Sequence, residues 1–466
     1  MKKQNLSIFA VLIMICTVFC IGCAGAQQNI GDAGESAIPY ENVEGEGLEG
    51  NDSGEKIKII LATSGYGDGL SRVVSDFNRS QSEYEVEIKN YRSDSLYYKT
   101  QEDRDNMMLD LLGKEPYDLI DLDCFESGNP DISDLIQHKY IVDLTPYVEN
   151  SELISFNDFE EKAVDLCRDG EYVAAIPYSY LIWSSMVDGD IFDADGISVD
   201  ELLEYNRSHP GLCLYEGAGQ YDVLDYLLFN NLDYFVDWES EKCDFQNDKF
   251  KEIAEYAAQY PEEGDFHLDN MPAKFDKDMI KPYYIEGIRT FVEFRTVNQP
   301  ENGIYAGIPT MDGHYRTQIA LGLYGAALGI TSVSDNKEGA FKFIEYYLNS
   351  EPYSRDAYAE PGIPVNKKYL MEQIEKLKDE DDINNKCGGL FGRGTDREVA
   401  FQRHPITDEE ENDFYSLIAG AEPKYGKNSP LISIIEEEIG AYFSGQKSLD
   451  EVTKVIQSRA SLFMVE

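Results

Sequence analysis

The sequence predicts an α/β fold with mostly parallel sheets and more than one domain. Over residues 57–122, strand-like and helix-like patterns alternate in the order β-α-β-α-β, which favours a parallel sheet with helices on both faces. Residues 56–466 contain enough apolar residues to fold. At about 410 residues, this segment is too long for a single hydrophobic core and suits two domains. Amphipathic helical patterns fill the C-terminal part, so helices are expected to complete the fold.

The elements at the start of the folded part are defined by the spacing of their apolar residues. Helices repeat apolar residues every three or four positions, and half-buried strands alternate apolar and polar residues. A glycine just after the last apolar turn can end a helix. The expected elements are a strand at Ile57–Leu61, a helix with Leu70, Val73, Val74 and Phe77 on its buried face, a strand at Tyr84–Ile88, a helix with Met108, Leu111 and Leu112 that ends at Gly113, and a strand at Asp118–Leu122.

The middle and the end of the chain continue the mixture of strands and helices. Capping boxes at Ser198–Glu201 and Ser448–Glu451 each predict the start of a helix. The segment Val236–Phe245 has the pattern of a small hairpin. Further strands are expected at Tyr172–Ile176, Gly303–Pro309 and Ala326–Thr331, and further helices at Asp248–Tyr260, after Asp335 and over Ile432–Tyr442.

The N-terminus has the pattern of a secretory signal peptide. Lys2 and Lys3 precede a nearly unbroken apolar run that is shorter than the roughly 18–20 residues of a membrane span. Gly22 and Cys23 resemble a bacterial lipobox, although Cys20 stands where Leu is usual. We expect residues 1–22 to be removed and Cys23 to carry lipid, which would hold the protein on the extracytoplasmic face of the cell membrane. A plain signal with an incidental cysteine is the alternative.

A flexible tether and a strong negative charge follow. Residues 23–55 are acidic and Gly-rich, with little to bury. The chain has 40 Lys plus Arg against 88 Asp plus Glu, and without Lys2 and Lys3 the charge is about −50, from 38 minus 88. This charge repels nucleic acid and anionic lipid and disfavours an anionic ligand. Nucleic acid is therefore excluded as a partner.

Cysteine and histidine usage gives no pattern for a metal or a disulfide framework. The cysteines after the signal region are widely spaced, odd in number and form no CxxC pair, which favours free buried thiols. The histidines fall in no HExxH or HxH arrangement. We therefore expect no metal site and no cofactor. The cysteines are Cys124, Cys167, Cys213, Cys243 and Cys387, and the histidines are His138, His209, His267, His314 and His404.

Catalytic motifs are also lacking. The chain has no GxSxG and no P-loop, and the Gly-rich stretch Gly65–Gly69 lacks the lysine of a phosphate-binding loop. Asp193–Gly196 resembles the start of a calcium loop but has no glutamate at the twelfth position, so a turn is the better interpretation. Paired carboxylates, which a glycosidase needs, carry no information in so acidic a chain. The sequence favours a protein that is not an enzyme.

Four stretches resemble the family 1 extracellular solute-binding proteins, the class that includes the maltose-binding protein. Tyr140–Tyr147 resembles the family's DLTPY segment, and Asp169–Tyr178 resembles a strand that ends in Ile-Pro-Tyr. Leu328–Ile344 resembles a Gly-Ile strand followed by a helix that begins Asn-Lys-Glu-Gly-Ala. The tail from Ile434 to Glu466 is similar to the end of many lipoproteins of this family. Each motif alone is weak, and their order and spacing make the set specific.

The resemblance implies a periplasmic-binding-protein-like fold of two α/β lobes joined by a hinge. Each lobe would have a mostly parallel sheet flanked by helices. The first lobe would comprise residues 56–177 and 325–375, and the second residues 178–324 and 376–466. The chain would leave the first lobe near Ala175–Trp183 and return near Ala320–Ala327, and the closing helices would pack on the second lobe.

The resemblance also implies a function. The protein would be the monomeric substrate-capture lipoprotein of an ABC importer, binding a sugar or oligosaccharide between the lobes and delivering it to the permease subunits. A peptide, a polyamine or another polar solute is an alternative ligand. A surface-anchored glycoside hydrolase and a purely structural surface protein are alternative classes.

Candidate ligand-binding residues follow from position alone. Sugar sites place aromatic faces against C–H surfaces and planar polar groups against hydroxyls. In open α/β sheets, ligands bind outside the carboxyl ends of the strands. Trp238 lies in the expected hairpin and is assigned to packing. The residues expected to contact the solute, because they follow strands or lie at the lobe crossings, are Tyr66, Asp123, Tyr178, Tyr180, Trp183 and Tyr324.

Overall fold

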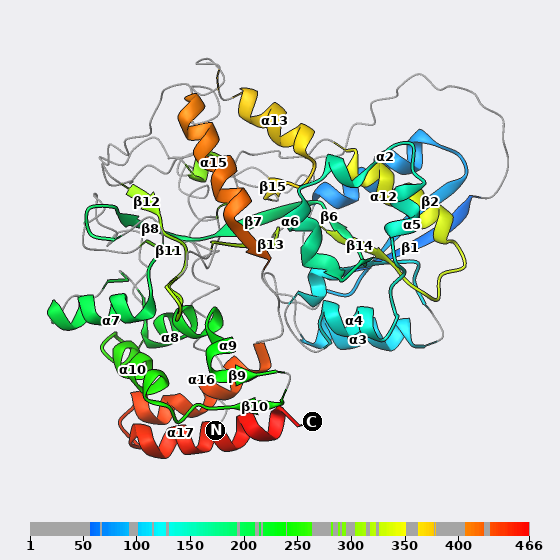
Figure 1. Ribbon diagram of the computed structural model, residues 1–466. Coiled ribbons are helices and arrows are strands. Elements are labelled where there is room, and N and C mark those ends of the chain that lie inside the picture. Colours follow the sequence, from blue (N-terminus) through cyan, green and yellow to red (C-terminus); the bar gives the residue numbers. More distant parts are fainter. Residues whose placement is uncertain are drawn as a thin grey trace, which may run out of the picture.

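A computed structural model shows two lobes joined by a small central sheet (Figure 1). The predicted signal peptide, the predicted lipidation site Cys23 and the tether lie outside the described residues. The structure describes residues 56–65, 68–92, 101–113, 116–126, 130–192, 196–209, 214–215, 218–238, 240–262, 281–282, 288, 291–294, 303–313, 317–322, 326–350, 362–376, 378, 406–423 and 429–465.

The first lobe is built on a five-stranded sheet in the order β2-β1-β3-β14-β6. Neighbours β2, β1 and β3 are parallel, whereas β14 is antiparallel to both β3 and β6. The predicted β-α-β-α-β order is confirmed here. The predicted strand over Tyr172–Ile176 is instead two short pieces, and Pro177 is part of the second. The strands are β1 (Ile57–Thr63), β2 (Tyr84–Asn90), β3 (Leu119–Asp121), β14 (Ala327–Ile330), β5 (Tyr172–Val173) and β6 (Ile176–Pro177), with β4 (Arg168–Asp169) paired to β5.

Helices cover this sheet and bury its apolar side chains. Val73, Val74 and Phe77 of α2 are buried as their spacing predicts, together with Phe343 and Ile344 of α12. Met107, and not the exposed Leu112, completes the buried face of α3. The helices are α2 (Asp68–Ser80), α3 (Gln101–Leu111), η1 (Leu122–Phe125), α4 (Ile132–Gln137), α5 (Thr145–Glu149), η2 (Phe156–Asp158), α6 (Glu161–Val164), η3 (Asp165–Cys167) and α12 (Lys337–Leu348).

The second lobe consists mainly of helices around its own core. The predicted capping boxes at Ser198 and Ser448 are present, and the predicted hairpin is the antiparallel pair β9 and β10. Strands β11 and β12 flank β8, and both pairings are antiparallel. Among the described strands, the mostly parallel sheet expected in each lobe is therefore seen only in the first lobe. The elements are β8 (Ser185–Asp188), α7 (Val199–Ser208), α8 (Gln220–Phe229), α9 (Leu232–Phe235), β9 (Val236–Asp237), β10 (Lys242–Cys243), α10 (Asp248–Ala257), β11 (Lys281–Pro282), β12 (Gly303–Tyr305), α16 (Ser429–Phe443) and α17 (Leu449–Phe463).

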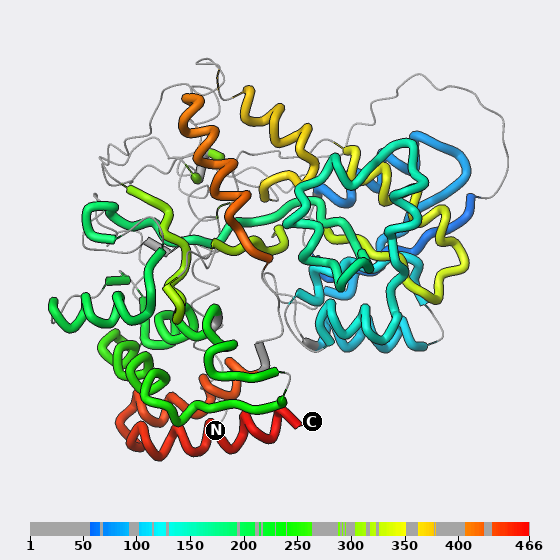
Figure 2. The backbone as a smooth tube through the Cα atoms, viewed as in Figure 1, coloured from blue at the N-terminus to red at the C-terminus, as the bar shows by residue number. Residues whose placement is uncertain are grey.

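The lobes are joined through a four-stranded sheet in the order β15-β7-β13-β16. Strands β7 and β13 are antiparallel, and β16 runs parallel to β13. Figure 2 shows the chain passing between the lobes at this level. The elements are β7 (Ser179–Trp183), β13 (Thr317–Leu321), β15 (Ile363–Pro364), β16 (Ala421–Pro423), α11 (Phe291–Phe294), α13 (Lys367–Lys376) and α15 (Asp408–Gly420).

The buried apolar side chains of the described residues form two core clusters. The first core contains the five-stranded sheet, its helices and the inner face of the joining sheet, and the second core contains α7–α10, α16 and α17. Phe414, Leu417 and Ile418 of α15 belong to the first core, whereas the predicted boundary at residue 376 assigns them to the second lobe. Beyond β16, the next described helix, α16, belongs to the second core.

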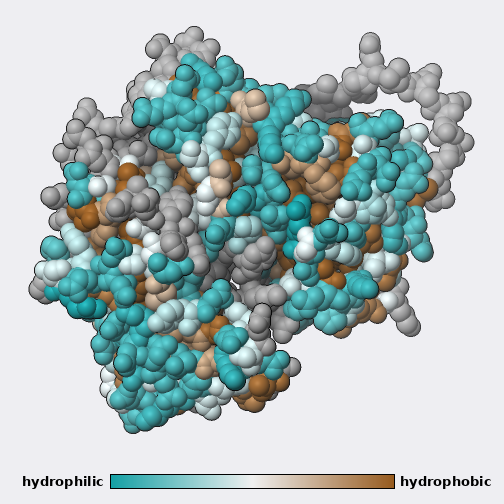
Figure 3. Space-filling model, in the orientation of Figure 1, coloured by the Kyte–Doolittle hydropathy of each residue, from teal (hydrophilic) through white to brown (hydrophobic). Residues whose placement is uncertain are grey.

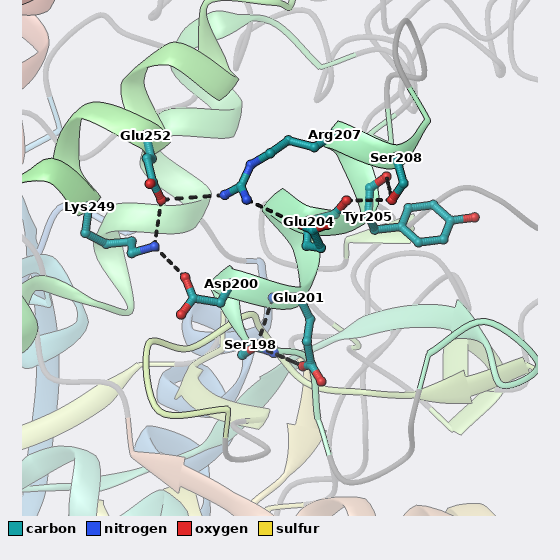
Figure 4. A network of polar contacts seen from close by, with 9 residues as sticks. All are labelled: Ser198, Asp200, Glu201, Glu204, Tyr205, Arg207, Ser208, Lys249 and Glu252. Carbon is teal, nitrogen blue, oxygen red and sulfur yellow. Dashed lines mark hydrogen bonds and ion pairs between the residues drawn. The ribbon is translucent and has the colours of Figure 1, made fainter.

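Ion pairs hold α7 against α10 on the second lobe (Figure 4). Lys249 of α10 pairs with Asp200 of α7 and, at 2.7 Å, with Glu252. Arg207 of α7 bonds Glu204 at 2.8 Å and reaches Glu252 at 3.7 Å. Basic groups on this surface are therefore neutralised by the surrounding acids.

The visible surface is largely hydrophilic, with small scattered apolar patches (Figure 3). Among the described residues, no helix is both long and apolar enough to span a bilayer. In the described part of the chain, Cys124, Cys167 and Cys243 form no disulfide, and the first two are buried. Cys213 and Cys387 lie outside the described residues.

Candidate functional site

The carboxyl ends of β1 and β3 meet at one edge of the first-lobe sheet, because the two strands are parallel neighbours. Thr63 Oγ1 donates to Asp121 Oδ2 at 2.8 Å, so side chains join the two strand ends. The backbone approaches closely here: a Cβ on Gly65 would lie 3.2 Å from Asp121 Oδ2. Since open α/β sheets bind ligands outside this edge, it forms the first part of the candidate site.

Asp123 lies at this edge, in the 3-10 helix η1 that follows β3 directly. The Asp121 side chain caps η1 by accepting from the Asp123 N–H at 3.2 Å. Asp123 is 8% exposed, so it is held in place while a small part of it reaches the surface. Asp123 therefore lies at the end of a strand, as the sequence predicted. Its contact with solute stays a prediction.

Arg104 is a charged residue near this edge that sequence reasoning missed. Cys124, next to Asp123, accepts from Ser64 N at 3.3 Å and from Ser64 Oγ at 3.2 Å. Arg104 is 9% exposed and lies within electrostatic range of Cys124, and burial lowers the pKa of Arg104. No motif marks this arginine, because only the packing of α3 brings it to the edge of the sheet.

Tyr178 and Tyr180 lie at the crossing, and their side chains pack in the first core. The Tyr178 ring stacks on Tyr347 with centroids 4.5 Å apart, and its hydroxyl donates to the Ser350 carbonyl at 3.2 Å. Tyr180 is fully buried. Burial raises the pKa of Tyr180 well above its usual value. This placement favours a packing role for both tyrosines over the predicted contact with solute.

Trp183 lies at the end of β7, and its side chain packs against the second core. It is directly opposite Gln318 of β13, so both side chains project from the same face of the joining sheet. The side-chain carbonyl of Gln318 is buried without a hydrogen-bond partner among the described residues. Sequence reasoning could not find Gln318, because the pairing register of β7 and β13 is a tertiary property.

The strand-end group and the joining sheet are connected through Glu126. Glu126 Oε1 accepts from the Leu321 N–H of β13 at 3.1 Å. Glu126 follows Asp123 by three residues, and Leu321 follows Gln318 by three residues. The structure therefore brings η1 to the strand that carries Gln318. Tyr66 and Tyr324, the remaining predicted contacts, lie outside the described residues.

The described part of the chain has no group of His, Cys, Asp or Glu side chains arranged to hold a metal ion. What it offers at the candidate site is a carboxylate, a guanidinium, an indole and a primary amide. These groups can stack on a polar solute and hydrogen bond to it.

A family profile decides the affiliation of the chain. The profile described as "Bacterial extracellular solute-binding protein" matches residues 63–353, which is more than half of the 466 residues. The chain belongs to this family. The match includes segments of both lobes and of the joining sheet, and it confirms the resemblance seen in the sequence.

Solved structures support the same fold for this solute-binding protein. The sugar-binding protein MalE from Xanthomonas citri has a TM-score of 0.55 and 12% identity, over 88% of this chain and 97% of that one. A periplasmic oligogalacturonide-binding protein from Yersinia enterocolitica has a TM-score of 0.52 and 11% identity, over 88% and 99%. A family 1 extracellular solute-binding protein from Alicyclobacillus acidocaldarius has a TM-score of 0.50 and 11% identity, over 89% and 100%.

These similarities confirm the two-lobed α/β fold predicted from the sequence. No curated protein matches the chain significantly. Family and fold are those of binding proteins.

Proposed function

We propose that this protein captures a sugar or oligosaccharide between its lobes and delivers it to the permease subunits of an ABC importer. The observation that carries the proposal is the family match, which spans segments of both lobes and of the sheet that joins them. Solute capture uses this architecture directly, because a ligand that contacts both lobes favours the closed arrangement by its additional contacts there. The protein's task then ends with recognition and release.

A carbohydrate fits the groups at the candidate site. Trp183 offers an aromatic face for C–H surfaces. The Gln318 carbonyl, which has no partner within the described part of the chain, can accept from a hydroxyl. Asp123 can accept from further hydroxyls at the strand-end edge. Two proteins of the same fold are described as a sugar-binding and an oligogalacturonide-binding protein. The net charge of −48 disfavours an anionic solute such as the latter, so a neutral sugar is the better candidate.

We assign the solute contacts to residues of both parts of the site. Asp123 and Tyr66 would serve at the strand ends, and Trp183 and Tyr324 at the crossings. Arg104 and Gln318 join this set because of their placement. Tyr178 and Tyr180 would act indirectly, by packing the sheet that carries Trp183.

The proposal includes the location of the protein. Cys23 would be lipidated after removal of residues 1–22, and residues 23–55 would tether a monomeric binding protein to the extracytoplasmic face of the cell membrane. The support is the pattern of the N-terminal sequence together with membership of an extracellular family.

A thermal-shift screen of the purified protein tests the proposed function. The panel contains neutral mono- and oligosaccharides, oligogalacturonides, short peptides and polyamines. A ligand at 100 times its Kd should add about 2.7 kcal/mol to the free energy of unfolding. The Trp183→Ala variant should lose this stabilisation, while Trp238→Ala should keep it.

Other outcomes of the screen exclude the proposal in distinct ways. Stabilisation by polyamines or peptides alone would replace the sugar by another polar solute. Hydrolysis of a sugar at a rate abolished by one Asp or Glu substitution would identify a glycoside hydrolase. No stabilisation by any member of the panel would favour a purely structural surface protein.

A further inference from the structure

The segment that returns from the joining sheet to the first lobe is held by side chains at both of its ends. This return segment, residues 321–327, leaves β13 at Leu321 and enters β14 at Ala327. The Leu321 N–H donates to Glu126 Oε1 at 3.1 Å. At the other end, the Ala326 N–H donates to the Tyr347 hydroxyl at 3.0 Å, and the Ala327 N–H donates to Asp121 Oδ1 at 3.2 Å. All three acceptors belong to the first lobe.

The Leu321 N–H is available to a side chain because a neighbouring strand stops short. Gly322 donates to the Ser179 carbonyl of β7, and N–H groups alternate in direction along a strand. The Leu321 N–H therefore points to the opposite edge of β13, where β16 lies. The last residue pair on that edge is Ile319 with Pro423, so β16 ends before it reaches Leu321. Glu126 supplies an acceptor where the strand gives none.

The acceptors at the other end are buried and firmly placed. Asp121 is 2% exposed and also accepts from Thr63 Oγ1 at 2.8 Å and from the Asp123 N–H at 3.2 Å. Tyr347 is 3% exposed, and its ring stacks on Tyr178. A buried carboxylate with several donors holds them strongly, because losing any one leaves a buried polar group without its partner.

We propose that Asp121, Glu126 and Tyr347 form a clamp that fixes both ends of the return segment, Leu321 and Ala326–Ala327, to the first lobe, so that hinge bending takes place outside these positions. The proposal rests on the proposed function, of which hinge closure is a part. The clamp residues are positioning residues. They hold backbone groups of the crossing chain and act on the solute through it.

The clamp determines which lobe carries which candidate contact. The clamp places both ends of the return segment on the same body as Asp123. The boundary between the cores lies elsewhere, between Ile182 in the first core and Trp183, which packs against the second. Bending is therefore expected around Trp183–Ser185. A solute would meet the first lobe as a preformed surface, and the second lobe would close on it.

Residue-resolved amide hydrogen exchange on the ligand-free, full-length protein tests the clamp. In Glu126→Ala, exchange at Leu321 should become at least about tenfold faster, because a hydrogen bond to a charged acceptor is lost. In Tyr347→Phe the faster exchange should appear at Ala326 instead. Glu126→Gln keeps a carbonyl acceptor and should leave Leu321 near its wild-type rate. Glu149→Ala, a change at an exposed carboxylate of α5, is the matched control and should alter neither amide.

Two results would overturn the clamp: unchanged exchange at Leu321 in a folded Glu126→Ala protein, or acceleration spread evenly over the whole chain in both variants. If Glu126→Ala does not fold, Tyr347→Phe decides alone, because it removes one hydroxyl and keeps the ring. No solute is present, so a failure of the proposed sugar ligand leaves these rates unchanged, and the two hypotheses fail separately.

Discussion

Gly339 of α12 lies directly on the ring of Tyr84 in β2. A Cβ built on Gly339 would come within 2.5 Å of Tyr84 Cδ1 and 3.1 Å of Ile59 Cδ1 in β1. Helix α12 can therefore approach the sheet closely at this turn only because the residue has no side chain. The contact joins a helix after the return segment to the first two strands of the chain.

Substitution of this glycine should destabilise the protein. In an exposed helix interior, Gly→Ala stabilises by about 0.5–1 kcal/mol. At Gly339 we expect a loss of about 1–3 kcal/mol, because the added methyl group overpacks the core. The control is Gly69→Ala in α2, where no atom lies within 4 Å of the added Cβ. Urea denaturation measures both variants, and a stabilised Gly339→Ala protein would contradict the packing.

Trp183 distinguishes a contact with solute from a packing role. Trp183→Ala should weaken binding of the sugar found in the screen by about 1–3 kcal/mol, as expected for an aromatic contact in a binding site. If the ring serves only the second core, the loss should appear as about 3–5 kcal/mol of global stability with unchanged affinity. Titration calorimetry and urea denaturation separate the two. Trp238, which donates to Asp233 Oδ1 at 2.7 Å on the surface, provides the control substitution.

Asp225 should make stability depend on pH. It lies in α8, partly buried, and its Oδ1 has no hydrogen-bond partner among the described residues. It faces Glu436 of α16 and Asp222 of its own helix. Burial, followed by the charge of Glu436, raises the pKa of Asp225 well above its usual value. The folded state therefore binds this proton more tightly than the unfolded chain does. The free energy of unfolding should fall as the pH rises from about 3.9 towards the raised folded value.

Asp225→Asn should remove this contribution, so its free energy of unfolding should decline less with pH than that of the wild type. Urea denaturation at several pH values from 4 to 8 measures the difference. Glu255→Gln, at an exposed carboxylate of α10, should retain the wild-type dependence. Parallel pH profiles for the wild type and Asp225→Asn would show that Asp225 does not titrate in this way.

If Cys23 carries the lipid anchor, its substitution should change how the protein is distributed between the membrane and soluble fractions of the cell. Cys23→Ala removes the thiol directly after Gly22 and should move the protein from the membrane to the soluble fraction. Immunoblots of both fractions measure the distribution, with Cys16→Ala in the apolar run as the matched control. A Cys23→Ala protein that stays with the membrane as fully as the wild type would exclude lipidation as the anchor.

The sequence predicted well those elements that depend on residues close together in the chain. The capping boxes at Ser198 and Ser448, the hairpin over Val236–Phe245 and the buried face of α2 are all present. Such features depend on residues that are neighbours in the sequence, so they can be identified from one sequence alone. The strand expected at Gly303–Pro309 is shorter, β12 ending at Tyr305, because a strand's ends depend on its partners.

The site was less accessible to sequence reasoning. Asp123 was found because it follows a strand, and that rule is local. Tyr180 was selected for its place at the crossing, but the alternation of side chains along β7 turns it into the first core, while Trp183 points the other way. Gln318, Glu126 and Arg104 were missed because their neighbours lie far away in sequence and only the fold brings them together.

The first core is assembled from distant parts of the chain. It begins with Ile59 in β1 and is completed by Phe414 and Ile418 in α15 and by Ala421. A chain emerging in order from its N-terminus therefore cannot finish its first lobe before about residue 421 is free, even though most of that lobe is made early. Until then the joining sheet exposes the apolar surface that α15 will cover. The growing chain can therefore aggregate or bind chaperones during that time. The dense negative charge of the chain, through mutual repulsion, counteracts that hazard during the delay.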